Sequence, residues 1–341
     1  MRVLRVLVVD DSATARSLVV SILASDATIE VIGEARDGVE AVEMCERLRP
    51  DLVTMDLQMP EMDGVQAIRQ IMVAHATPIV VVASLESSDV TASMRALEAG
   101  ALAVLVKSAG PGTPRFERDR RELLATVKAM AQVKLVRRWA AVPPYRVAPI
   151  PPRPSEILAV GLVASTGGPN ALRSVLSALP STFPPPIFVV QHIASGFAKG
   201  LAEWLATTTS RTVKPAVHGE PLAANTVYVA PDDRHLEASR DHLIVSKTAP
   251  VGGFRPSGSR LLSSLAATFG SKAIGVIMTG MGRDGVDGLR ALRDAGGAVF
   301  AQDEESCDIF GMPGVALQTG VVETTTPLAT IPQRLAELVG V

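Results

Sequence analysis

Three apolar runs in the second half of the chain each end in a residue type that hydrolytic enzymes use. The first run ends at Ser165, the second ends at His192, and the third leads into a glycine-rich turn that carries Asp284. Such runs are typical of buried parallel strands, and functional groups collect beyond the carboxyl ends of strands in doubly wound sheets. The sequence therefore predicts a nucleophile, a general base and an orienting carboxylate at one edge of a sheet.

The turn after the first run is the most informative of these signals. The apolar residues 157–164 are followed by Ser165, by Gly167-Gly168, and then by a helical pattern over 171–179. Glycine permits a tight turn, which exposes the hydroxyl of a strand-end serine to the free amides of the next helix. A phosphate-binding loop is the alternative, but the segment lacks the G-x-G-x-x-G spacing and no Walker lysine follows it.

The other histidines offer weaker candidates for the base. His235 is the alternative to His192. It lies with His218 and His242 in a region of short runs and turn residues, which predicts a hairpin excursion from the main sheet.

Further motifs accompany the three residues. From residue 157 onward they are Gln191-His192, Pro231 with Arg234-His235-Leu236, Arg255-Pro256-Ser257, Thr279 to Gly285, Asp303 to Cys307 and Phe310-Gly311-Met312-Pro313. With these motifs, this part of the chain resembles the catalytic domain of chemotaxis protein-glutamate methylesterases. The resemblance implies a triad of Ser165, His192 and Asp284. It also implies an oxyanion site at the backbone N–H groups of Met281 and Thr166, with no cofactor for the ester chemistry.

The first part of the chain alternates strand and helix patterns and places charged residues at strand ends. Asp10, Asp11 and Asp56 follow two of the strands, and Lys107 follows another. Converging carboxylates fit a hard divalent cation, and Mg²⁺ prefers oxygen ligands. We expect Asp11, Asp56 and the backbone carbonyl of Gln58 to bind Mg²⁺, with Asp10 acting through water.

In this interpretation Asp56 also attacks a phosphoryl group, and Lys107 pairs with the transferred oxygens. The alternative is that the acids are helix N-caps and Lys107 is a solvated surface charge. The motifs Val9-Asp10-Asp11-Ser12 and 56–64, together with Lys107, resemble those of a response-regulator receiver domain. The resemblance implies a flavodoxin-like sheet of five parallel strands and phosphorylation of Asp56.

Two positions depart from the receiver pattern. The family usually places Ser or Thr directly after the fourth strand, where we expect Ala83, so the phosphoryl-binding hydroxyl is either missing or displaced to Ser84. Ser108 follows the lysine, where the family usually has proline. Both departures predict a weakened phosphorylation switch.

A basic and then proline-rich stretch joins the two parts. Apolar residues recur at roughly helical spacing up to Leu135, and 142–154 is rich in proline, which predicts a helical extension and an extended tether. We therefore expect a receiver over 1–125, an extension and linker over 126–155, and a doubly wound α/β methylesterase domain with a hairpin excursion over 156–341.

Composition and charge limit the class of protein. The 341 residues are 47% hydrophobic, enough for two cores, and the formal net charge of −2 disfavours nucleic acid as a partner. Cys45 and Cys307 fall in different domains, so we expect neither a disulfide framework nor a metal cluster. No run approaches ~18 apolar residues, and Met1 leads directly into a strand. We expect a cytoplasmic protein without membrane insertion.

Together the two resemblances imply a phosphorylation-activated serine hydrolase. We expect it to remove methyl esters from glutamates on the cytoplasmic helices of chemoreceptors during chemotaxis adaptation, with deamidation of receptor glutamines as a related activity. A chemotaxis histidine kinase is the expected phosphodonor. The alternative is a receiver-controlled adaptor without enzymatic activity, which binds a chemosensory-like signalling complex.

Overall fold

The computed structural model describes residues 3–133 and 157–341, and the chain divides into two compact units between residues 138 and 139. The predicted proline-rich linker lies outside the described residues. Each unit is described below by itself.

The first unit is a five-stranded parallel α/β sheet with strand order β2-β1-β3-β4-β5. Its elements are β1 (Leu4–Val9), α1 (Ala13–Ala24), β2 (Ile29–Ala35), α2 (Gly38–Leu48), β3 (Leu52–Met55), α3 (Gly64–His75), β4 (Ile79–Ala83), α4 (Ser87–Ala99), β5 (Ala103–Val106) and α5 (Phe116–Met130). The central strands are buried along almost their whole length because helices cover both faces of the sheet, with α1 and α5 on one face. The predicted receiver fold is confirmed.

The helix boundaries of this unit follow from local chemistry. Ser12, Asp37 and Asp63 are N-caps whose side chains accept hydrogen bonds from backbone N–H groups in the first turns of α1, α2 and α3. Helix α5 continues to Met130 with Val127 fully buried, so it packs on the receiver beyond the expected boundary at residue 125.

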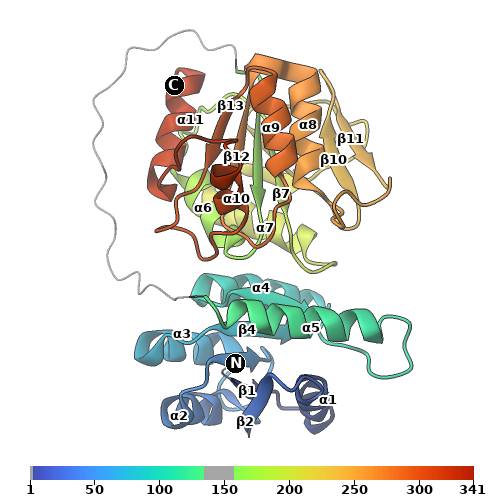
Figure 1. Ribbon diagram of the computed structural model, residues 1–341, viewed down its shortest axis with the longest axis vertical. Helices are drawn as coiled ribbons and strands as arrows, with labels where there is room; N and C mark the ends of the chain where they lie inside the picture. The colour runs from blue at the N-terminus through green and yellow to red at the C-terminus, as the bar shows by residue number, and fades with distance from the viewer. Residues whose placement is uncertain (1–2, 134–156) are drawn as a thin grey trace. The chain divides into compact units, whose positions relative to one another are not determined.

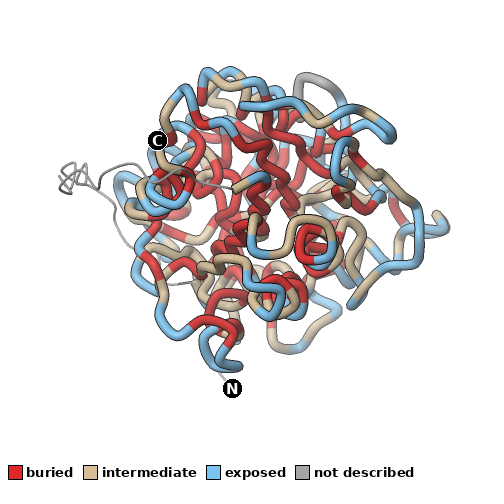
Figure 2. The backbone as a smooth tube through the Cα atoms, turned by 90° about the horizontal axis from the view of Figure 1, so that it is seen from above, coloured by how far each residue is buried: buried red, intermediate tan, exposed pale blue. Residues whose placement is uncertain are grey.

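The second unit contains a six-stranded parallel sheet with order β13-β12-β6-β7-β9-β8 (Figure 1). Its elements are β6 (Ala159–Ala164), α6 (Gly168–Ala178), β7 (Ile187–Gln191), α7 (Ala198–Thr209), β8 (Thr212–Pro215), β9 (Thr226–Val229), β10 (His235–Ala238), β11 (Leu243–Ser246), α8 (Gly258–Phe269), the 3₁₀-helix η1 (Gly270–Lys272), β12 (Ala273–Ile277), α9 (Val286–Asp294), β13 (Ala298–Ala301), α10 (Met312–Gln318), the 3₁₀-helix η2 (Leu328–Thr330) and α11 (Ile331–Val339). Strands β6, β7 and β12 are buried along their whole length, and Figure 2 shows the buried segments of the chain in red.

Helices cover both faces of this sheet, as the apolar runs predict. Helices α8 and α9 pack together against β6 and β12, whereas α6 packs beside α7 and α11 (Figure 1). Gly161 in β6 allows α8 to approach closely, because a Cβ there would lie 2.7 Å from a Leu265 methyl carbon. Strands β10 and β11 form a separate antiparallel pair, which confirms the predicted hairpin excursion.

Candidate active site and phosphorylation site

The strand order of the second unit places three candidate residues at one edge of the sheet. The chain runs outward from β6 to β7 and the edge strand β8, places β9 between β7 and β8, and then returns on the other side of β6 with β12 and β13. The carboxyl ends of β6 and β12 therefore flank the point where the order reverses, which is where doubly wound sheets bind ligands. Ser165 follows β6, His192 follows β7, and Asp284 lies in the loop after β12.

A close-packed turn holds Ser165. Its N–H donates to the Thr279 carbonyl at 3.0 Å, and its own carbonyl accepts from the Gly168 N–H and from the Gln191 side-chain amide at 2.8 and 2.7 Å. Gly167 has φ of 76°, the left-handed region that favours glycine. A Cβ at Gly168 would lie 1.9 Å from Gln191 Oε1, so both glycines are required by the geometry of the turn.

His192 is held on two sides. Its Nε2 lies 2.9 Å from Asp284 Oδ2, and the Phe254 ring stacks on the imidazole with 4.5 Å between centroids and 18° between planes. Because Nε2 donates to the carboxylate, Nδ1 is the nitrogen that carries the free lone pair. Within residues 3–133 and 157–341, neither this buried Nδ1 nor Ser165 Oγ makes a side-chain hydrogen bond. The nucleophile and base are thus on neighbouring strand ends without a hydrogen bond between them.

Asp284 is a buried carboxylate with a full set of donors. Its Oδ1 accepts from Ser257 Oγ at 2.8 Å and from the Ser259 N–H at 3.1 Å. Its Oδ2 accepts from the Gly258 N–H at 2.6 Å in addition to His192. Burial alone raises the pKa of this carboxyl, but the His192 contact and the other donors outweigh burial and lower the pKa to about 2. The side chain is therefore ionised at neutral pH.

The loop after β12 lies against the serine turn. A Cβ at Gly280 would be 2.5 Å from the Ser165 Cβ, and the Thr279 hydroxyl donates to the Thr166 carbonyl at 2.9 Å. In the described part of the chain, the backbone N–H groups of Thr166 and Met281 donate to no protein acceptor. They belong to the two loops that meet at Ser165, and so are available to an oxygen bound there.

His235 is unsuited to the role of alternative base. The residue is fully buried, its Nε2 lies 3.1 Å from the Ala249 carbonyl oxygen, and its Nδ1 accepts from the Ser257 N–H at 3.3 Å. Both ring nitrogens are occupied, so neither can take a proton from Ser165.

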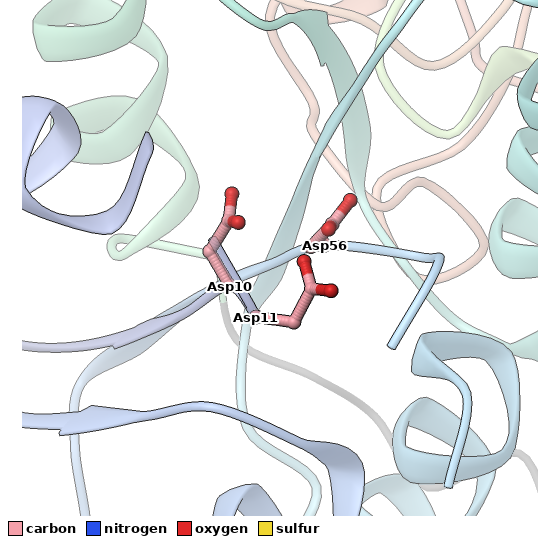
Figure 3. A group of neighbouring side chains, drawn as sticks. All are labelled: Asp10, Asp11 and Asp56. Atoms are coloured by element: carbon pink, nitrogen blue, oxygen red, sulfur yellow. The ribbon is translucent and has the colours of Figure 1, made fainter. Parts of the chain in front are cut away.

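The predicted acidic cluster is present in the first unit (Figure 3). Asp10, Asp11 and Asp56 each offer a carboxylate oxygen, and these oxygens lie within 4.8 Å of one another. Lys107 Nζ lies 2.9 Å from Asp10 Oδ2 and 2.8 Å from Asp56 Oδ2. Three hard oxygen donors at a strand edge fit Mg²⁺, and Asp56 also faces the lysine expected to bind phosphoryl oxygens.

The electrostatics of Asp56 reflect its burial. Burial raises the pKa of this carboxyl, and the nearby Asp10 charge adds to the effect, while Lys107 and the Leu57 N–H oppose it. Burial lowers the pKa of Lys107 when taken alone, but its contacts with Asp56 and Asp10 carry that pKa above the ordinary value. The lysine is therefore a permanent cation beside the acids.

The remaining predicted receiver residues lie at the same edge of the sheet. Gln58 is exposed and lies in the loop after β3, two residues beyond Asp56. The expected end of the fourth strand is wrong by one residue. Strand β4 extends to Ala83, so Ser84 and not Ala83 directly follows the strand. The Ser84 hydroxyl accepts from the Glu86 N–H at 3.4 Å.

Several residues around the triad carry no recognisable signal of their role in the sequence. Phe254 covers the base, Ser257 binds Asp284, and Gln191 and Thr279 brace the serine turn. Ser257, Gln191 and Thr279 lie within motifs noted above, but nothing in their spacing indicates which side chains they contact.

A receiver domain followed by a doubly wound domain with Ser, His and Asp at one sheet edge defines a response regulator with a hydrolase-like output domain. Comparisons identify the family. The response regulator receiver domain model matches residues 6–113, and the CheB methylesterase model matches residues 160–335. The chain belongs to the protein-glutamate methylesterase/protein-glutamine glutaminase family.

Relatives match nearly the whole chain. Protein-glutamate methylesterase/protein-glutamine glutaminase 4 of Myxococcus xanthus is 52% identical over 97% of this chain and 96% of its own length. Protein-glutamate methylesterase/protein-glutamine glutaminase 3 of Anaeromyxobacter dehalogenans is 51% identical, and the match covers 98% of each chain. The crystal structure of the Thermotoga maritima CheB methylesterase catalytic domain is 39% identical, with a TM-score of 0.52, and covers 53% of this chain and 98% of that one. Among the helices of the described residues, none combines the length and apolar character needed to cross a membrane.

Proposed function

We propose that this chain is a phosphorylation-activated serine hydrolase that removes methyl esters from glutamate side chains of chemoreceptors. The observation that carries the proposal is the His192–Asp284 pair, 2.9 Å between Nε2 and Oδ2, at the strand end beside Ser165. Family membership supports the substrate class, because relatives over the full length are protein-glutamate methylesterases/protein-glutamine glutaminases. The adaptor alternative gives no reason for a buried carboxylate that holds His192 by Nε2 and leaves Nδ1 free beside Ser165.

In the first half of the reaction Ser165 Oγ attacks the ester carbonyl carbon. The hydroxyl proton passes to His192 Nδ1, the nitrogen whose lone pair is free because Nε2–H donates to Asp284. The N–H groups of Met281 and Thr166 hold the oxyanion of the tetrahedral intermediate. The intermediate collapses to an acyl-enzyme as the C–O bond to the methoxy group breaks, and His192 returns the proton to give methanol.

In the second half a water molecule attacks the acyl-enzyme while His192 Nδ1 takes one of its protons. Collapse releases glutamate and restores the Ser165 hydroxyl with that proton. The same steps applied to a glutamine side chain release ammonia in place of methanol, which supports deamidation as the related activity. None of these steps requires a cofactor.

Regulation is assigned to the receiver. We propose that a histidine kinase supplies the phosphoryl group, that Asp56 accepts it, and that Lys107 binds its oxygens. Asp10, Asp11, Asp56 and the Gln58 carbonyl would hold Mg²⁺, which supplies charge neutralisation for phosphoryl transfer when bound. Ser84 is the candidate hydroxyl contact for the phosphoryl group. The proposed site of action is the cytoplasm, where the receptor helices present their methylated glutamates.

The test is methanol release from methyl-labelled chemoreceptor membranes with and without acetyl phosphate. Wild type should release methanol, and acetyl phosphate should increase the rate. Ser165→Ala should lower the rate by a factor on the order of 10⁴ or more, with an unchanged melting curve, because the nucleophile is lost and the fold is not. Ser174→Ala, in helix α6 with an exposed hydroxyl, is the matched control and should keep full activity. Substantial release by Ser165→Ala would contradict the proposal.

A further inference from the structure

We propose that His235 is a positioning residue for the catalytic carboxylate, acting through the N-terminus of helix α8. The inference rests on the proposed function, since it concerns the same active site. His235 lies on β10, 49 residues before Asp284 in the sequence and outside the six-stranded sheet, and has no contact with the reacting atoms in the proposed mechanism. It is nonetheless fully buried, as is Ser257, which it contacts.

The start of helix α8 is built around Asp284. Ser257 is the N-cap, and its hydroxyl donates to Asp284 Oδ1 while accepting from the Arg260 N–H at 3.3 Å. The next two N–H groups, those of Gly258 and Ser259, also donate to the carboxylate. Three of the four donors that hold Asp284 therefore come from three consecutive residues, and the position of Ser257 sets all three.

The N–H of Ser257 itself needs an acceptor, because it is buried. In a capping box, a Glu or Gln three residues after the N-cap reaches back to this N–H. Here that position is Arg260, which has no acceptor and instead pairs with Glu237 at 2.8 Å. His235 Nδ1 takes the acceptor role from a distant strand, at 3.3 Å from the Ser257 nitrogen. It replaces the missing half of the capping box.

The two partners of His235 fix its protonation. The Ala249 carbonyl can only accept, so Nε2 carries the hydrogen, and the Ser257 N–H can only donate, so Nδ1 carries the lone pair. A single neutral tautomer satisfies both contacts. The ring thus links the loop at Ala249 to the N-terminus of α8, and through Ser257 and Asp284 to His192.

Removing the acceptor should affect catalysis more than folding. A buried N–H left without a partner has to turn toward another acceptor or water, which moves Ser257 and with it the donors to Asp284. The carboxylate then loses its alignment with His192 Nε2. Small displacements of groups that orient a catalytic base lower kcat, whereas KM is unaffected when the substrate contacts are intact.

Two substitutions separate the two hydrogen bonds of His235. In His235→Asn the side-chain oxygen can occupy the place of Nδ1 and accept from Ser257, but the bond to Ala249 is lost. In His235→Gln the amide nitrogen can occupy the place of Nε2 and donate to Ala249, but the acceptor for Ser257 is lost. Each variant loses one buried hydrogen bond, so the pair is matched in stability and differs in the bond that leads to Asp284.

The experiment measures kcat and KM for methyl-ester hydrolysis, melting temperatures, and the proton NMR resonance of His192 Nε2–H, in the full chain. We expect His235→Gln to lose roughly tenfold in kcat with KM unchanged. In this variant the resonance of His192 Nε2–H should move from its wild-type position. His235→Asn should keep kcat within about twofold and keep the resonance, while both variants melt at similar temperatures.

Equal losses of kcat in the two variants, or full activity of His235→Gln, would overturn the inference. Should neither variant fold, ¹⁵N NMR of the wild-type His235 ring decides, since a proton on Nδ1 excludes the bond from Ser257. The failure of the proposed function is recognised separately. In that case wild type shows no hydrolysis that depends on Ser165, while the His192 resonance still reports whether His235 positions Asp284.

Discussion

Replacement of Asp284 by asparagine should destabilise the second unit in a manner that depends on pH. The carboxylate accepts from four donors, of which Gly258 N–H and His192 Nε2 bind Oδ2, and Ser257 and Ser259 bind Oδ1. Asparagine keeps the shape but offers only one acceptor oxygen. Its NH₂ group must face two donors, whichever way the amide is turned.

The size of the effect follows from the pKa of Asp284. It lies at about 2, against an ordinary value of 3.8, and at ~1.4 kcal/mol per pH unit this corresponds to about 2 kcal/mol of folding free energy. The pKa is lower in the folded state than in the unfolded state, so the ionised carboxylate stabilises the fold above about pH 4. This contribution is lost as the pH falls from about 4 to about 2, and roughly half of it is gone at pH 3.

The measurement is urea denaturation at pH 7 and in steps down to pH 3. Trp204, in helix α7, reports unfolding of the second unit by fluorescence once Trp139→Phe has removed the other tryptophan. Asp287→Asn is the matched control on the neighbouring helix α9, because its side chain is 68% exposed and, among the described residues, pairs with Arg283 alone. We expect this control to change the free energy of unfolding by less than about 0.5 kcal/mol at every pH.

The pH dependence of the stability gap distinguishes a contribution from the charge of Asp284 from a contribution of its shape. Asp284→Asn should cost about 2 kcal/mol at pH 7, and the gap to wild type should narrow as the pH falls. A gap that stays constant between pH 7 and pH 3 would show that the carboxylate contributes through its shape and not through its charge. That result would refute the assignment of Asp284 as the ionised partner of His192.

Two further predictions concern Phe254 and Asp56. Phe254→Ala removes the ring stacked on His192 and should lower kcat for ester hydrolysis by roughly tenfold. Phe254→Tyr keeps a ring and should retain most of the wild-type kcat. Equal rates for the two variants would contradict a role for the ring. Asp56→Asn should abolish labelling by acetyl phosphate and raise the melting temperature of the receiver at neutral pH. Burial raises the pKa of Asp56, so the ionised carboxylate opposes folding of the receiver. The stability gain of the variant over wild type should therefore grow as the pH rises from about 4. Calorimetry that shows a variant less stable than wild type at neutral pH would exclude this reasoning.

The sequence predicts this fold well because the central strands of both sheets are buried on both faces. A strand covered by helices on both sides reads as a continuous apolar run, and the residue that ends the run marks the carboxyl edge of the sheet. Ser165 and His192 follow such runs directly, which is why the strands β6 and β7 and their terminal residues could be recognised. Glycines that the turn requires can also be recognised in the sequence, because few other residues adopt a left-handed conformation such as that of Gly167, with φ of 76°.

The contacts that orient the site could not be predicted in this way. Phe254 and Ser257 lie in an irregular segment before α8, and His235 lies on a strand of the hairpin excursion, so no periodic pattern relates them to His192. Their roles depend on where the loops meet in space. The end of β4 shows the same limit on a smaller scale, because Val82, Ala83 and Ser84 are all compatible with the last position of a strand.

The low pKa of Asp284 has a consequence for the two reactions of the family. A carboxyl with a pKa of about 2 does not accept the proton that His192 takes from Ser165, so the proton stays on the imidazole and remains available to the leaving group. Methoxide and an amide nitrogen differ in how much they need it, because the nitrogen must be protonated before its bond to carbon breaks. Orientation of the imidazole by Asp284 and Phe254 therefore matters more for glutamine than for the methyl ester. A substitution that disturbs this orientation should reduce ammonia release more than methanol release, with both reactions lost when Ser165 is removed.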